Sequence, residues 1–468
     1  MAQELPTDVL EVVFGHCWDA KDCSEWSTMD PLRLPMLFLR VCSSWRKAAV
    51  SCPKIWSELS VTFDEESLEE LAFAGLENST VFETWFRLRG QKGPRRLRFV
   101  FDCDLETPFG LTLPATWQEY LQHFELITKG SHIAPILDIF TPTSQFPFLE
   151  TLVVWSSKLD GFCKERDDVD LSPDAHRHLV PPHIAARLRR LWIRNYEPPH
   201  CLGQGVGETL SCLTHLVVEY PLEGISSLLI ACPRLEEAVF FVTSGLDADN
   251  EAEPTSRFAL RKLTLFLQRG QNDGDGDFSN LFRGWHFPSL EHLQLSCVKG
   301  RFHTLTWEDI LGTAPALKEL YIGPRINTYP NAGHTVLHLI NQCAPFLETL
   351  ILDHSQAMTH VLPVEEIRDF LSARRDCRSW STVKTLVLVF PNKHLAQPRT
   401  YRDEPLDPDC LLKELQVFVD QGLELVVKET ELPHRMILWP NFMYRGVRWR
   451  ESDRRPWVEH YSTYRAFV

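Results

Sequence analysis

The stretches PSLEHLQL (residues 288–295), PALKELYI (315–322) and PFLETLIL (345–352) share one pattern, in which Pro is followed two residues later by the template L-x-x-L-x-L. Pro ends a preceding helix because it has no backbone N–H to donate. The last two apolar positions of the template alternate as they do in a strand with one buried face. Each copy therefore predicts a turn followed by a strand.

The same template recurs along most of the chain. Successive copies from residue 188 onward start 22 to 36 residues apart, mostly at or above the upper part of the leucine-rich range of roughly 20 to 29 residues. Weaker copies are Leu235-Ala238-Phe240 and Pro94-Leu97-Phe99. The clear copies are Leu149-Leu152-Val154, Leu188-Leu191-Ile193, Leu213-Leu216-Val218, Leu260-Leu263-Leu265, Leu290-Leu293-Leu295, Leu317-Leu320-Ile322, Leu347-Leu350-Leu352 and Val383-Leu386-Leu388.

Apolar helical segments precede several of these turns, at residues 225–233, 307–315 and 336–345. The repeating unit is thus strand, loop, helix and Pro turn. One unit cannot bury its strand and its helix alone, so neighbouring units must stack. The sequence predicts an α/β solenoid with a parallel sheet on the concave side and helices on the convex side, in which Leu293, Leu320 and Leu350 are equivalent buried positions.

The first 60 residues follow a different pattern. Apolar residues at 6, 9, 10, 13 and 14 line one face of a short helix, and residues 37–49 restore the helical spacing after a polar insert. Cys52-Pro53 ends that segment, and residues 54–61 are predicted to enter a strand. So small a helical segment buries too little of its own surface to be stable alone.

Within this region Leu5-Pro6, Val13-Phe14, Val41-Cys42 with Trp45-Arg46, Pro53 and Ile55-Trp56-Ser57 are similar to the F-box pattern of fungal F-box proteins. The resemblance covers residues 4 to about 60, although residues 17–36 are longer than the usual F-box turn. The repeats resemble leucine-rich repeats over about residues 145–390. The resemblance implies an F-box domain at 1–60, a solenoid at 61–440 and a tail or cap at 441–468.

An F-box protein with leucine-rich repeats is the substrate-recognition subunit of an SCF-type E3 ubiquitin ligase. The resemblance therefore implies a Skp-type adaptor as partner, a cullin scaffold bound through it, and an unknown target held by the repeats. It implies no catalytic residue and no cofactor in this chain. The adaptor contact would be made by Leu5, Pro6, Val9, Leu10, Val13, Val41 and Trp45.

Two other functions stay open at this point. The solenoid alone would suit a scaffold or inhibitor protein without a ligase role, its N-terminal helices serving only as a cap. An enzyme would need an active site assembled in the long loops, because no G-x-S-x-G, H-E-x-x-H or Walker motif is present.

The target surface is predicted from strand alternation. If Leu152 and Val154 face the core, then the residues between and after them face the concave side. The same offset in later strands gives a row rich in aromatic residues, and exposed aromatic and Arg side chains are common binding anchors. The alternative is that a loop or the tail after Pro440 covers the row. The predicted target contacts are Trp155, Trp192, Arg194, Phe241, Phe266 and Tyr321.

Composition narrows the partner classes. A net charge of −15 disfavours a nucleic-acid binder, which needs clustered Lys and Arg. No signal peptide and no stretch of about 20 apolar residues is present, so no membrane contact is expected. The 13 Cys are scattered singly, as reduced core thiols of an intracellular protein are. A cytoplasmic or nuclear location is therefore expected.

Three kinds of motif resemble ligand-binding sites, but their residues fit surface loops or solvated faces better. Asp273 to Asp277 alternate as in a calcium loop but lack its Gly and its final Glu. Residues 203–207 lack the remaining glycines of a dinucleotide loop. Three basic clusters, near residues 95, 190 and 450, are expected to be solvated faces rather than an acidic-target site. No metal site is predicted.

Overall fold

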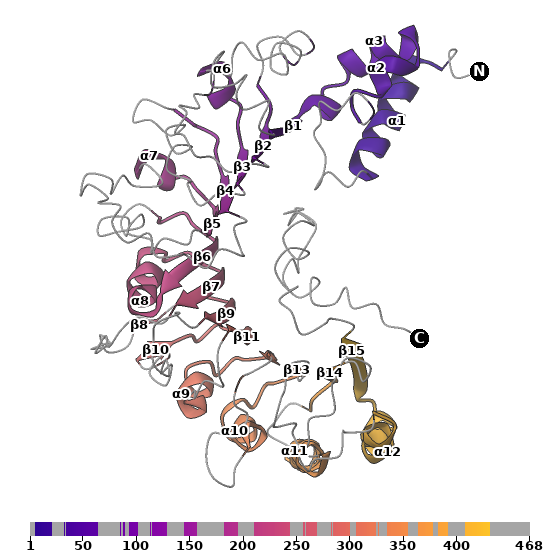
Figure 1. Cartoon of the computed structure of the whole chain (residues 1–468). Coiled ribbons are helices and arrows are strands. Elements are labelled where there is room, and N and C mark those ends of the chain that lie inside the picture. The colour runs from indigo at the N-terminus through magenta and orange to yellow at the C-terminus, as the bar shows by residue number, and fades with distance from the viewer. Residues whose placement is uncertain are drawn as a thin grey trace. The chain divides into compact units, whose positions relative to one another are not determined.

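A computed structural model shows an α/β protein of parallel strands and helices (Figure 1). Two compact units make it up, one ending at Leu213 and the other beginning at Thr214. The structure describes residues 5–20, 32, 34–63, 85, 88, 93–101, 113, 115–128, 145–156, 182–194, 210–243, 256–257, 259–268, 282, 284–299, 306–323, 326, 335–353, 364–377, 382–391 and 408–430.

The first unit begins with a group of short helices, called here the helix cluster: α1 (Thr7–Ala20), α2 (Phe38–Val41), α3 (Ser43–Ser51) and the 3-10 turn η2 (Lys54–Trp56). The helix predicted over 37–49 is divided because Cys42 has an extended backbone, with φ −161° and ψ 176°. The strand predicted over 54–61 is wrong at its start, since η2 precedes β1 (Glu58–Phe63).

Four more strands follow in the first unit and pair in parallel in the order β1-β2-β3-β4-β5. One face of these strands is apolar and buried, as at Leu97, Phe99 and Phe124. The faint repeat at Pro94-Leu97-Phe99 is therefore a strand of the sheet. The strands are β2 (Arg96–Phe101), β3 (His123–Thr128), β4 (Thr151–Ser156) and β5 (Arg190–Arg194), with the short helices α6 (Ala115–Gln118) and α7 (Pro182–Ala185) between them.

Eight parallel strands form the described sheet of the second unit, in the order β6-β7-β9-β11-β12-β13-β14-β15. A two-stranded pair lies apart from this sheet, β8 (Ser256–Arg257) with β10 (Trp285–His286). The strands of the sheet are β6 (His215–Pro221), β7 (Glu237–Thr243), β9 (Lys262–Gln268), β11 (His292–Lys299), β12 (Glu319–Ile322), β13 (Thr349–Asp353), β14 (Thr385–Pro391) and β15 (Glu424–Thr430).

The helices of the second unit alternate with these strands, and in Figure 1 those labelled α9 to α12 lie along one side of the strand layer. They are α8 (Leu222–Ala231), α9 (Trp307–Gly312), α10 (Val336–Cys343), α11 (Val364–Asp376) and α12 (Pro408–Val419). The predicted alternation of strand, helix and Pro turn is confirmed for α8, α9 and α10, each of which ends within three residues of a Pro. The fold class, α/β with a parallel sheet, is confirmed.

The leucine template sets the register of the sheet. Leu293 lies beside Leu320, and Leu320 beside Leu350, and each is at most 1 % exposed. Their prediction as equivalent buried positions is confirmed. Each position contributes one apolar side chain to a core shared with the neighbouring strand, so no repeat is stable by itself.

The division at Leu213 falls within residues 61–440, and the helix cluster shares a unit with the first five strands. The domain bounds predicted from the resemblance, 1–60, 61–440 and 441–468, stay predictions. The tail at 441–468, the Asp273–Asp277 loop and the glycine-rich residues 203–207 lie outside the described residues.

Candidate functional site

Three aromatic side chains form the centre of the helix cluster. Phe14 of α1 stacks on Phe38 of α2 with 4.1 Å between ring centroids, and Trp45 of α3 meets Phe14 edge-on at 5.1 Å. Leu10 lies one turn before Phe14 and is 1 % exposed. One face of α1 is thus buried against the two following helices.

Polar contacts fix the ends of the cluster. The Ser51 hydroxyl at the end of α3 donates to the Glu11 carboxylate of α1 at 3.1 Å. Trp56 Nε1 donates to the Ala49 carbonyl at 2.7 Å, and the Trp56 ring meets Trp85 edge-on. Because Trp56 and Ile55 are fully buried, η2 joins the helices to the strand that follows.

The outer surface of the helix cluster is unusually apolar. Of the twelve large apolar side chains that are exposed among the described residues, seven lie between residues 5 and 50. Val9 and Val12 are separated by one helical turn and so share the outward side of α1, and Leu37 and Val41 are related in the same way across α2. The seven, called here the apolar surface, are Leu5, Val9, Val12, Leu32, Leu37, Val41 and Val50.

Most predicted adaptor residues lie at or beside this surface. Leu5, Pro6, Val9 and Val41 are exposed, while Val13 and Trp45 are partly buried. Leu10 is the exception, because it is only 1 % exposed and lies on the packed face of α1 with Phe14.

Sequence reasoning missed four members of the apolar surface, Val12, Leu32, Leu37 and Val50. Val12 is 59 % exposed and Leu32 is 71 % exposed. A signal for Val12 existed, because it is apolar although it lies off the face predicted from residues 6, 9, 10, 13 and 14. Leu32 and Val50 have no comparable pattern around them.

Residues of the predicted target row lie on neighbouring strands, and those whose side chains are described are buried. Phe241 lies beside Phe266 in the adjacent strand, and their rings stack with centroids 4.8 Å apart. The Tyr321 hydroxyl donates to Asp353 at 2.6 Å. Trp192, Phe241, Phe266 and Tyr321 are nevertheless all less than 8 % exposed, so they are not an open binding surface. Trp155 and Arg194 lie on β4 and β5, but their side chains are outside the described residues.

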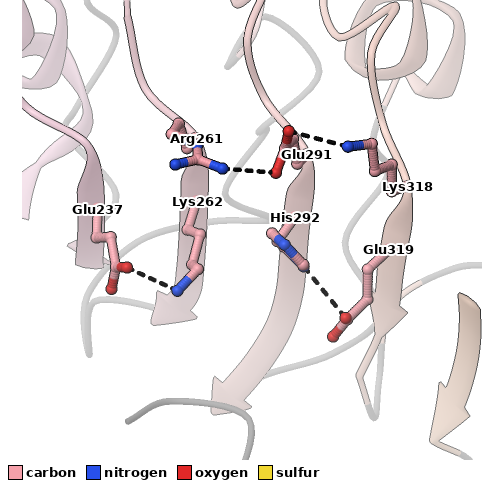
Figure 2. Close-up of polar contacts among 7 residues, drawn as sticks. All are labelled: Glu237, Arg261, Lys262, Glu291, His292, Lys318 and Glu319. Carbon is pink, nitrogen blue, oxygen red and sulfur yellow. Dashed lines mark hydrogen bonds and ion pairs between the residues drawn. The ribbon is translucent and has the colours of Figure 1, made fainter. Parts of the chain in front are cut away.

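A row of ion pairs crosses the start of the strands in the second unit (Figure 2). The Glu291 carboxylate accepts hydrogen bonds from Arg261 at 3.1 Å and from Lys318 at 3.0 Å. The hydrogen bond from Lys318, supported by Arg261, lowers the pKa of Glu291. Farther along, Lys384 pairs with Glu348 at 2.9 Å.

A second row of polar contacts lies one residue farther into the strands. Lys262 Nζ donates to Glu237 at 2.6 Å, and His292 lies 3.1 Å from Glu319 (Figure 2). Exposed ion pairs contribute only about 0 to 1 kcal/mol each. We therefore assign the ion pairs of both rows to the choice of strand register, because these Lys and Arg side chains meet carboxylates of neighbouring strands only in this alignment.

The backbone reinforces the same register. The N–H groups of Lys318 and Glu319 both donate to the Glu291 carbonyl, at 2.8 and 2.9 Å, and those of Glu348 and Thr349 donate to Lys318 in the same way. Side-chain and main-chain contacts thus repeat at one position of successive strands. The charged side chains at this edge of the sheet therefore serve the structure, because they pair with one another across neighbouring strands.

The first unit contains a polar cluster on β2 and β3. Glu125 lies 3.6 Å from Arg98 and 3.8 Å from His123, and all three are largely buried. Burial lowers the pKa of His123 below its ordinary 6.5. Burial also opposes ionisation of Glu125, but Arg98 and His123 outweigh it and hold the pKa of that carboxyl below its ordinary value.

These two shifts predict acid sensitivity. The unfolded chain binds more protons than the folded chain once the pH falls below about 6.5. The free energy of unfolding therefore keeps its full value above that pH, and it declines as the pH falls toward the lowered pKa of His123. We expect His123→Gln to reduce the slope of unfolding free energy against pH by up to about 1.4 kcal/mol per pH unit. Urea unfolding at pH 7, 6 and 5 measures the slope.

The matched control is His338→Gln, since His338 is exposed on α10. It should leave the slope as in the wild type. Equal slopes for His123→Gln and the wild type would show that the buried imidazole does not control the pH dependence.

Nothing in the described part of the chain suggests a metal centre or a membrane span. No three His, Cys, Asp or Glu side chains there are placed to share an ion, and no described helix is long and apolar enough to cross a bilayer. Of the seven cysteines whose side chains are described, Cys52 and Cys232 are buried and the other five are partly buried. Burial raises the pKa of Cys232 to about 12, which keeps it a thiol.

No family model and no curated protein matches this chain.

Proposed function

We propose that this chain is the substrate-recognition subunit of an SCF-type E3 ubiquitin ligase. The helix cluster binds a Skp-type adaptor through its apolar surface, and the adaptor links the chain to a cullin scaffold. The parallel α/β units hold the target protein. The chain contributes no catalytic residue, and its role is to hold the target near the ubiquitin carried by another enzyme, which raises the local concentration of the reacting groups.

The observation that carries this proposal is the gathering of exposed apolar side chains on the helix cluster. The cluster already has a packed aromatic centre, so these side chains are surplus to its own folding. Exposed large apolar side chains that concentrate in one small part of a protein favour a protein contact there. The F-box resemblance over residues 4 to about 60 favours a Skp-type adaptor as the partner in that contact.

Adaptor binding should depend on Val9 and Val41, which both belong to the apolar surface. We expect Val9→Asp/Val41→Asp to abolish capture of the adaptor from solution, because a buried charge replaces an apolar anchor at two places and each central anchor alone contributes about 2 kcal/mol or more. The assay is pull-down of purified Skp-type adaptor by the full-length chain.

Ile230→Asp is the matched control, because Ile230 is an equally exposed aliphatic residue on α8 in the second unit. It should leave capture unchanged. If the wild type fails to capture the adaptor, the proposed function is wrong, and the scaffold or inhibitor and the enzyme are the functions left open. If the double variant captures it fully, the contact lies elsewhere on the chain.

A further inference from the structure

We draw no further inference here: the strongest candidate, the group of buried aromatic side chains on β7, β9 and β12 of the second unit (Phe241, Phe266 and Tyr321), carries none because nothing in the described residues shows what covers it.

Discussion

Replacing Arg374 with Ala is expected to lower the free energy of unfolding by about 3 to 5 kcal/mol, because the change removes a large buried side chain and several hydrogen bonds to a charged group. Arg374 lies on α11 and is 1 % exposed. Its Nη2 donates to the Ile340 carbonyl at 2.8 Å and to the Ala344 carbonyl at 2.7 Å, and its Nε donates to Asn341 Oδ1 at 2.7 Å.

These contacts place the guanidinium at the C-terminal end of α10, where the helix dipole favours a cation. Burial lowers the pKa of Arg374 to about 10, so the side chain remains charged at neutral pH. One residue thus joins two consecutive helices of the second unit. Its loss should loosen the contact between α10 and α11.

Arg375→Ala is the matched control for this prediction. Arg375 is the next residue on α11, is exposed, and pairs with Asp376 at 2.9 Å. An exposed pair contributes about 0 to 1 kcal/mol. Urea unfolding followed by circular dichroism should separate the two variants clearly, and equal stabilities would show that Arg374 does not hold α10 to α11.

A second large effect is expected in the sheet. Leu320→Ala should cost about 2 to 5 kcal/mol, because Leu320 is fully buried between Leu293 and Leu350 and a cavity would remain. Stacked repeats share their cores, so the damage should reach both neighbouring strands. Hydrogen exchange should therefore quicken in β11 and β13 as well as in β12.

Val417→Ala provides the comparison, since Val417 is half-exposed on α12. Its replacement should alter stability by about 0.5 kcal/mol at most. Faster exchange confined to β12 would show that the strands do not share one cooperative core.

The strands were predictable because each repeats an apolar pattern of fixed phase. Leu386 and Leu388 fall in β14 as the template requires, and even the faint copy at Leu97 is a strand. Element boundaries were less predictable. Cys42 interrupts a helix whose apolar spacing continues across it, and Lys54 to Trp56 form a 3-10 turn although Ile and Trp favour strands.

The sequence contains a pattern for the ion-pair row. From the copy at Leu235 onward, the second residue of the template alternates in sign through Glu236, Arg261, Glu291, Lys318, Glu348 and Lys384. Charged residues at this position are ordinarily taken as solvated. Only the alignment of neighbouring strands shows that opposite charges meet there (Figure 2).

Exposure was the least predictable property of the candidate sites. Strand alternation correctly placed Phe241 and Phe266 on the face away from the leucines, but alternation says nothing about how much solvent reaches that face. The apolar pattern of α1 likewise did not show which of its residues are exposed. Leu10 and Val9 are adjacent apolar residues, yet one is buried and the other exposed.

Hydrogen exchange of the full-length chain with and without purified Skp-type adaptor tests the central claim most directly. We predict slower exchange in α1 and in α2 through α3, which contain most of the apolar surface, and little change in β11 to β14 of the second unit. An adaptor that leaves exchange in residues 7–20 and 38–51 unaltered, or that slows it only in the second unit, would contradict the account.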